Sequence, residues 1–259
     1  MPLTRLLAAL QALRGRRARI LCYHSISDRR TDRWAVGTRQ FAAHLALLRQ
    51  EGWAILPLQE LVARLKKGQD CPRTVALTFD DGYLDFLENA LPILKEFAAP
   101  ATLFAPVGLL GGASRWVAEA PEAPLLDLPG LEQAARAGVE IGSHSFSHRR
   151  LPELDAAGLE QELAGSFRWL QARLGIAPQA FSYPFGEFGP REAAAARAAG
   201  YACACDFGGL LGNGRETDPY RLKRDPLTRP DGESGLRAIL YGRRDLRRAL
   251  RKLRLTPLR

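Results

Sequence analysis

Thr78-Phe79-Asp80-Asp81-Gly82-Tyr83 is the stretch that decides the organisation of this chain. Residues 73–79 are apolar and β-branched, which predicts a buried strand that ends at the two carboxylates. Leucines recur at helical spacing over residues 84–97, which predicts a helix directly afterwards. Gly82 permits the sharp turn that joins the two elements. The stretch therefore predicts a βα unit with two adjacent acidic groups at its turn.

Asp80 and Asp81 are costly to place at the end of a buried strand, because like charges repel and burial penalises each charge. A bound cation would relieve that cost, so a metal site is the first hypothesis. Neighbouring strand residues point to opposite faces, and we therefore expect one carboxylate to bind the metal and the other to transfer protons. The alternative is a polar turn in which an Asp caps the following helix.

Strands and helices alternate along the chain, and no internal repeat or low-complexity linker interrupts them. Repeated βα units predict a parallel sheet or barrel, and 259 residues suit one large α/β domain. We expect strands at 18–23, 53–56, 73–79, 101–104, 139–143, 180–183 and 201–205, helices at 39–51, 58–67, 84–97, 131–137, 155–174 and 190–199, and a long Gly/Pro-rich loop through residue 130. Parallel barrels carry their chemistry at the carboxyl ends of the strands, where the motifs below fall.

His144 and His148 directly follow the strand expected at 139–143. Their spacing lets both imidazoles bind one ion from a helical face or from a tight turn. The pattern His-x-x-x-His is a weak signal by itself. Combined with a carboxylate from the Asp-Asp pair, it gives two imidazoles and one carboxylate, a set that leaves positions open on a catalytic metal.

Two further strand ends carry candidate residues. Ser182-Tyr183-Pro184-Phe185-Gly186 is either part of the site or a plain turn, in which Pro and Gly are usual. His24 follows the first strand and is a site candidate by the barrel rule, although a lone His is more often structural. His44 falls on a helix and is interpreted as a surface or packing residue.

The Thr78–Tyr83 stretch, the His144/His148 pair and Tyr183-Pro184-Phe185-Gly186, in this order, resemble the polysaccharide deacetylases, the NodB-homology domains of carbohydrate esterase family 4. The resemblance covers roughly residues 18–226, and its first two motifs together are highly specific. It implies a distorted (β/α) barrel of seven-strand type. It also implies a metal-dependent hydrolase that removes acetyl groups from N-acetylated sugars, or O-acetyl groups.

The resemblance also implies roles for individual residues. Asp81, His144 and His148 are expected to bind a divalent metal, with zinc as the default and cobalt, nickel or iron as alternatives. Asp80 is expected to be the general base, and the backbone around Tyr83 to stabilise the oxyanion. Tyr183, Pro184 and Phe185 are expected at the substrate. A metal-bound water would attack the acetyl carbonyl, and an acid would protonate the leaving amine.

The chain departs from the family pattern at two positions. Members usually take their acid from a Leu-x-Ile-His motif near the C-terminus, and this chain has no His after His148. We therefore predict His24 as the acid, as in the branch where the last strand stands first. Ser182 replaces the usual Arg that orients the base, and Arg224 is predicted to reach Asp80 instead. Asp206 is a weaker supporting candidate.

Basic residues are concentrated at the two ends of the chain, whose net charge is +9. Residues 1–19 hold five basic and no acidic side chains, and residues 243–259 hold eight and one, so the body between is slightly acidic. Leucines at helical spacing accompany both ends, which predicts either contact with an anionic membrane surface or two ordinary packed helices. No nucleic acid is expected. The expected division is a basic helix at 1–17, the deacetylase domain at 18–235 and a basic helix or tail at 236–259.

Four scattered cysteines form no Cys-x-x-Cys pair, which predicts buried free thiols in a reducing compartment. The first residues lack a clear cleavage site, and no apolar run has transmembrane length. We therefore expect a cytoplasmic protein that works near the inner membrane, on a polysaccharide or glycolipid precursor. The alternatives are a glycan-binding protein without turnover, a deformylase-like C–N amide hydrolase, and an iron oxygenase, whose antiparallel barrel the βα rhythm opposes.

Overall fold

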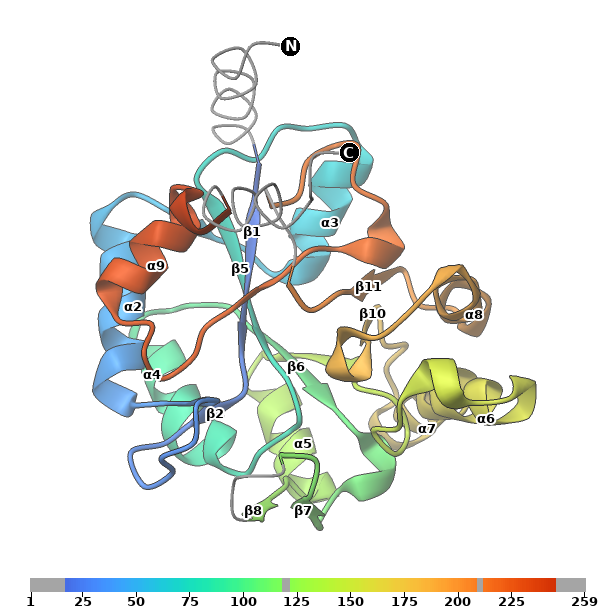
Figure 1. Ribbon diagram of the computed structural model, residues 1–259. Coiled ribbons are helices and arrows are strands. Elements are labelled where there is room, and N and C mark those ends of the chain that lie inside the picture. The colour runs from blue at the N-terminus through green and yellow to red at the C-terminus, as the bar shows by residue number, and fades with distance from the viewer. Residues whose placement is uncertain (1–16, 118–121, 209–211, 246–259) are drawn as a thin grey trace, which may run out of the picture.

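The computed structural model describes residues 17–117, 122–208 and 212–245. Within them, an eight-stranded parallel sheet curls into a half-barrel surrounded by helices (Figure 1). The strand order is β11-β10-β9-β6-β5-β1-β12, and β4 pairs with β5. The strands are β1 (Arg19–Tyr23), β4 (Ala54–Ile55), β5 (Thr74–Phe79), β6 (Thr102–Ala105), β9 (Glu140–Ser143), β10 (Ala180–Ser182), β11 (Cys203–Cys205) and β12 (Asp225–Pro226). The prediction of a distorted barrel with parallel strands is confirmed.

The helices cover the outside of the sheet. They are α2 (Thr38–Gln50), α3 (Leu58–Lys66), α4 (Leu91–Glu96), α5 (Leu128–Arg136), α6 (Ala156–Glu160), α7 (Ser166–Leu174), α8 (Pro190–Ala199) and α9 (Glu233–Leu240). Two predicted helices contain π-helical turns, η1 (Phe86–Ala90) before α4 and η4 (Gln161–Gly165) between α6 and α7. The expected cap at Asp155 is present, because its side chain accepts a hydrogen bond from the Gly158 N–H at 2.8 Å.

Two apolar cores lie on opposite faces of the sheet. Leu21 and Val75 belong to the outer core beneath the helices, whereas Ile20 and Ala76 belong to the inner core, which Phe104 also joins. Successive residues of a strand point to opposite faces, so strands buried on both sides read as continuous apolar runs. This explains why the sequence shows uninterrupted apolar residues along β1 and β5.

Residues 222–226 cross the gap between the two edge strands of the half-barrel. Leu222 donates its N–H to Ala204 O at 3.0 Å and accepts from Asp206 N–H at 2.8 Å, beside β11. Asp225 then pairs with Leu21 of β1. The crossing carries Arg224, which is fully buried, to the inner face of the sheet. The path of this segment therefore determines where the Arg224 side chain lies.

The segment expected as one long loop through residue 130 is more ordered than predicted. It contains the short 3₁₀ helix η2 (Val107–Leu109) and an antiparallel pair, β7 (Ala113–Ser114) with β8 (Ala123–Pro124). Helix α5 begins at Leu128, three residues earlier than expected. The Asp127 side chain caps it by accepting from Gly130 N–H at 2.8 Å. A second two-residue pair joins β2 (Ser25–Ile26) to β3 (Ala35–Val36).

The remaining short helices of the described residues are all 3₁₀ turns. They are η3 (Leu151–Glu153), η5 (Pro184–Gly186) and η6 (Pro219–Arg221). Turn η5 follows β10 directly, and η6 packs against β11. These turns keep the chain compact where it leaves the carboxyl ends of the strands.

The ends of the described chain pack on the barrel. Arg19, counted by the charge pattern with the basic N-terminus, is 3% exposed and contacts Asp225 and Asp245. The boundary expected at residue 235 falls inside α9, so the packed chain continues to Asp245. Residues 1–16 and 246–259, which hold most of the two basic leucine stripes, lie outside the described residues.

The described residues bear on two predictions, one about membrane-spanning helices and one about the cysteines. No helix in these ranges has the length and apolar character needed to cross a membrane. All four cysteines, Cys22, Cys71, Cys203 and Cys205, are buried free thiols, as predicted. Burial raises the pKa of the Cys22 thiol well above its usual range, so this thiol is a poor nucleophile.

Candidate active site

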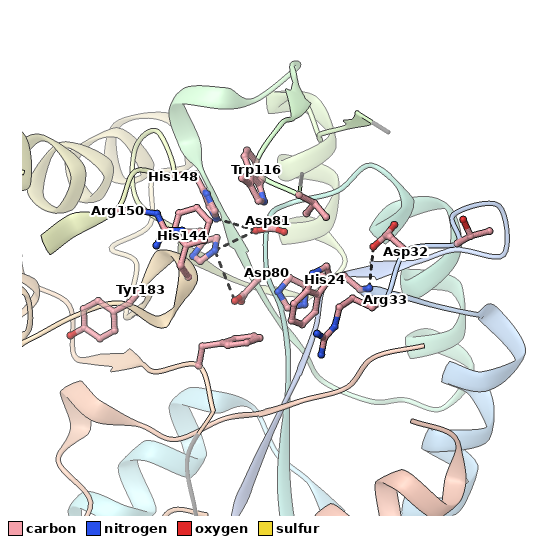
Figure 2. Close-up of a pocket in the computed structure, with 15 residues that line it drawn as sticks. His24, Asp32, Arg33, Asp80, Asp81, Trp116, His144, His148, Arg150 and Tyr183 are labelled. Carbon is pink, nitrogen blue, oxygen red and sulfur yellow. Dashed lines mark hydrogen bonds and ion pairs between the residues drawn. The ribbon is translucent and has the colours of Figure 1, made fainter. Parts of the chain in front are cut away.

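A pocket of about 650 Å³ opens at the carboxyl ends of the strands (Figure 2). Its lining includes both carboxylates of the Asp-Asp pair, three of the four histidines and several aromatic side chains. These residues come from the ends of β1, β5, β9, β10 and β11 and from the loops beyond them. The structure therefore brings together the separate motifs that the sequence singled out.

The turn after β5 directs both carboxylates into the same pocket. The strand ends at Phe79, and Asp81 has a φ of 72°, in the left-handed region that non-glycine residues rarely adopt. Gly82 continues at φ 64°, and a Cβ there would lie 3.3 Å from Ala105 Cβ. Asp80 and Asp81 are 2% and 3% exposed. The strand alternation is lost at this turn, which is why adjacent residues line one cavity.

His144 and His148 lie in a tight loop after β9, and they meet Asp81. The His144 Nε2 and His148 Nε2 atoms lie 3.4 Å and 3.3 Å from Asp81 Oδ1. The loop is not helical, because Ser145 has φ 69° and His148 has φ 56°. The three donor atoms all lie within 4.8 Å of one another. Of the two geometries that the spacing allowed, the tight turn is the one adopted.

This donor set fits a divalent cation. His144 Nδ1 donates a hydrogen bond to Ser182 O at 2.9 Å, so in the neutral imidazole the lone pair lies on Nε2 and is available to a metal. Burial alone would raise the pKa of Asp81, but the two imidazoles beside it hold that pKa well below its usual range. An ionised carboxylate with two imidazoles is a set typical of zinc and of other first-row divalent metals.

Asp80 is held by a different partner. Arg224 Nη1 and Nη2 each donate to one Asp80 carboxylate oxygen at 2.7 Å, so the predicted contact is present. Ser182 Oγ donates to Asp80 Oδ2 at 3.2 Å and accepts from Arg224 Nη2 at 2.8 Å. Burial would raise the pKa of Asp80, but Arg224, together with His144 and His24, outweighs it and lowers that pKa to about 2. Asp206 contributes its carbonyl, which accepts from Arg224 Nε at 2.7 Å.

His24 lies on the other side of Asp80 from the two metal-ligand candidates (Figure 2). One of its ring nitrogens is within 4.8 Å of an Asp80 oxygen. The ring packs against Trp34 and Phe207, with centroid distances of 4.8 Å and 5.7 Å. Its buried Nδ1 has no hydrogen-bond partner among the described residues. Burial lowers the pKa of His24, against the opposing effect of Asp81 and Asp80.

The remaining predicted residues surround this centre in different ways. The Tyr83 N–H has no acceptor in the described part of the chain, and its side chain is 1% exposed. Phe185 has φ 60°, is 37% exposed and packs its ring against His148 at 4.7 Å. Tyr183 reaches the pocket, although its hydroxyl donates to Tyr220 O at 3.0 Å. Pro184 is buried in the turn between them.

Sequence reasoning missed several pocket residues. Trp116 stacks on His148 with a centroid distance of 4.1 Å and an interplanar angle of 20°, and its buried Nε1 has no partner among the described residues. Arg150 lies 4.4 Å above the Phe185 ring, and Trp34 and Phe207 pack on His24. The only available signal was large aromatic residues inside loops, which no periodicity marks.

The sequence is similar to those of known deacetylases. The family model described as polysaccharide deacetylase matches residues 67–204. The "Putative polysaccharide deacetylase YxkH" of Bacillus subtilis (strain 168) is 30% identical over 183 residues, 70% of this chain and 61% of that protein. The poly-beta-1,6-N-acetyl-D-glucosamine N-deacetylase of Staphylococcus aureus (strain MSSA476) is 34% identical over 106 residues, 40% of this chain. The chain spans only 37% of the length of that enzyme.

Two solved structures share the fold at low identity. The Streptococcus pyogenes deacetylase PplD in complex with acetate superimposes with a TM-score of 0.74 at 22% identity, covering 86% of this chain and 98% of that chain. IcaB from Ammonifex degensii gives a TM-score of 0.74 at 23% identity, covering 88% of this chain and 98% of that chain. At these identities the likeness concerns the arrangement of the barrel.

Proposed function

The chain belongs to the polysaccharide deacetylase family, and from this premise we propose that it removes acetyl groups from the N-acetylated sugars of a polysaccharide. The observation that carries the proposal is the convergence of Asp81, His144 and His148 beside an ionised Asp80 in one pocket. A hydrolase needs an electrophilic centre, a base and an acid within reach of one bond, and this pocket contains a candidate for each.

Asp81, His144 and His148 would hold the metal, with zinc favoured by the ligand chemistry. Such an ion polarises an acyl carbonyl and lowers the pKa of a bound water. Asp80 accepts the proton of the attacking water, because Arg224 keeps its carboxylate ionised and fixed in orientation. The Arg usual at the position of Ser182 is thus replaced by Arg224, which directly precedes β12.

His24 is proposed to protonate the leaving nitrogen, since it flanks Asp80 on the side away from the other histidines. The free Tyr83 N–H is proposed to donate to the oxygen on which negative charge develops. Phe185 and Tyr183 are proposed to contact the sugar, together with Trp34 and Trp116 at the other sides of the pocket. Aromatic side chains suit the apolar faces of pyranose rings.

The substrate class is proposed from similarity. A relative named as a poly-beta-1,6-N-acetyl-D-glucosamine N-deacetylase supports a polymer of N-acetylglucosamine. The rival interpretation, a glycan-binding protein without turnover, rested on the missing Arg at Ser182, and the contact of Arg224 with Asp80 removes that support. Contact with a membrane surface and a cytoplasmic location stay predictions, because most of both basic ends lies outside the described residues.

Acetate release from oligomers of β-1,6-linked N-acetylglucosamine tests the proposal. We expect release with added zinc or cobalt, loss of release with a chelator, and recovery when metal is restored. Oligomers that bind the protein without any release of acetate, whichever metal is added, would overturn the proposal in favour of a binding protein. Formate release from formylated analogues in place of acetate would instead favour the deformylase-like alternative.

The role of His24 has its own test. In His24→Ala, folding and metal content are expected to be retained while the release of acetate from an amide substrate falls, by 10²- to 10⁴-fold for a proton-transfer group. An activated ester such as 4-nitrophenyl acetate should lose much less, because its leaving group needs no proton. Equal losses on both substrates would contradict the assignment of His24 as the acid.

A further inference from the structure

A buried glutamate on the helix behind the pocket holds the loop that carries the two histidines. Glu162 lies in the π-helical turn η4 and is 3% exposed. Its carboxylate accepts hydrogen bonds from the N–H groups of Phe146 and Ser147 at 2.9 Å and 2.8 Å, and from the Ser147 hydroxyl. Both N–H groups belong to the three residues between His144 and His148.

The charge of Glu162 is compensated by these donors alone. No Lys, Arg or His in the described part of the chain forms an ion pair with it. A buried carboxylate without a cation is costly unless several hydrogen bonds satisfy it. Bonds from N–H groups to an ionised acceptor are about twice as strong as neutral ones. Among the described residues, Glu162 is therefore the anionic anchor of the loop, whose Ser145 and Phe146 carbonyls also accept from the N–H groups of Val107 and Gly108.

The loop needs such an anchor because its backbone is strained. Ser145 and His148 both have left-handed φ angles, which cost on the order of 1–3 kcal/mol each in non-glycine residues. Such conformations persist only when the surroundings fix them. His148 N–H donates to Ser145 Oγ at 2.9 Å, which ties the end of the loop. Glu162 ties its middle.

The residue directly after turn η4, Ser166 at the start of α7, holds the residue that precedes the first histidine. Ser143 Oγ donates to Ser166 Oγ at 2.9 Å, and Ser166 Oγ donates to the Glu162 carbonyl at 2.6 Å. The Tyr201 hydroxyl donates to the Leu163 carbonyl at 3.2 Å, which fixes the turn from behind. Single π-helical turns recur at functional sites. Here the π-helical turn contacts the loop, and the first residue of α7 contacts the strand end.

We propose that Glu162 is a positioning residue for His144 and His148. It sets the backbone of residues 145–147, and through it the approach of both Nε2 atoms to Asp81. Ser166 supports it by fixing the end of β9. The inference rests on the proposed metal site but concerns a residue that neither touches the ion nor lines the pocket. Glu162 acts on metal affinity, and on chemistry only through that affinity.

The test compares zinc affinity in Glu162→Ala, Glu162→Gln and wild-type protein by competition with a chromophoric chelator. Changes to groups that orient metal ligands typically cost 10–100-fold in affinity, and that loss is expected for Glu162→Ala. Glu162→Gln keeps one acceptor oxygen, so a smaller loss is expected. Glu160→Ala is the matched control, because it removes an exposed glutamate two residues earlier whose ion-pair partner among the described residues is Arg168.

The electronic spectrum of bound Co²⁺ provides a readout that a loss of stability alone would not change. Circular dichroism first establishes that each variant is folded at the measuring temperature, and the spectrum then reports ligand geometry. Altered bands in Glu162→Ala and unaltered bands in Glu160→Ala support the proposal. If Glu162→Ala does not fold, Glu162→Gln decides. Wild-type affinity and spectrum in the folded variant would overturn the inference, whereas a wild-type protein that binds no metal would overturn the metal site itself.

Discussion

Arg224 and Asp225 are neighbours in the sequence, yet they belong to two separate buried clusters on opposite faces of the sheet. Arg224 points inward and holds Asp80 at the active site. Asp225 points outward and contacts Arg19, which also contacts Asp245. All five side chains are at most 3% exposed. The two clusters use the same residue types at the same depth but differ in stoichiometry, and the inner carboxylate also has His144 and His24 beside it.

The inner cluster pairs one guanidinium with one carboxylate in two-point geometry. This arrangement lowers the pKa of Asp80 to about 2 despite burial. The outer cluster makes one guanidinium serve two carboxylates. There burial raises the pKa of Asp225 to about 6, with Arg19 opposing the rise and Asp245 adding to it. A buried carboxylate with its own Arg thus stays ionised, as the proposed base must, whereas a shared Arg leaves a group with a pKa of about 6.

Replacing Asp by Asn in each cluster should give the largest difference in turnover between the two variants. Asp80→Asn removes the proposed base, and we expect turnover to fall by 10²- to 10⁴-fold. Asp225→Asn leaves the pocket intact, so its turnover should match wild type. The measurement is acetate release at saturating substrate, with metal content checked by elemental analysis. A comparable loss in Asp225→Asn would show that the two faces of the sheet are coupled.

Removing the guanidinium from each cluster should separate stability from chemistry. Arg224→Met and Arg19→Met both leave buried carboxylates unpaired, and each should lower the free energy of unfolding by about 3–5 kcal/mol. Only Arg224→Met should also reduce turnover, because only Asp80 needs its partner for proton transfer. Urea unfolding gives the first quantity, and acetate release below the unfolding temperature gives the second. Full turnover in folded Arg224→Met would remove Arg224 from the proposed mechanism.

The inner cluster could be predicted from the sequence, and the outer cluster could not. Ser182 stood where a charged partner for Asp80 was expected, and Arg224 became the candidate because a guanidinium can hold a carboxylate in two-point geometry. Arg19 instead stood in a run of basic residues and read as a surface group. Its partners Asp225 and Asp245 are 206 and 226 residues away, and only the closed fold reveals them.

The other features of the fold and of the site divide in the same way, into those that local sequence signals predict and those that only the closed fold reveals. The parallel barrel and the site histidines were predictable, because periodicity and strand-end position are local signals. The pairing of β7 with β8 was not, since strands of two residues have no periodicity. Trp116 was missed for a related reason. Its stacking on His148 depends on how the loop after β6 folds back over the loop after β9, which no residue spacing encodes.

The smallest expected difference between the two clusters is in how the free energy of unfolding depends on pH. The pKa of Asp225 is about 6 in the folded protein, against 3.8 for an unperturbed Asp, so between these values the folded state holds a proton that the unfolded state releases. Stability from this group is therefore present below pH 4 and is lost as pH rises towards 6. For Asp80, whose folded pKa is lowered to about 2, the sign is opposite, and its contribution is lost only as pH falls below 4.

Asp225→Asn should remove the first dependence and leave the second. We expect the variant to gain stability over wild type as pH rises from 4 to 6, by up to about 3 kcal/mol, with a constant difference above pH 6. Urea unfolding of both metal-free proteins at pH 4, 5, 6 and 7 measures the difference, in which titrations common to both proteins cancel. A difference that does not change over this range would mean that Asp225 stays ionised throughout. Arg19 would then satisfy two carboxylates as fully as Arg224 satisfies one, and stoichiometry would no longer explain why the two clusters differ.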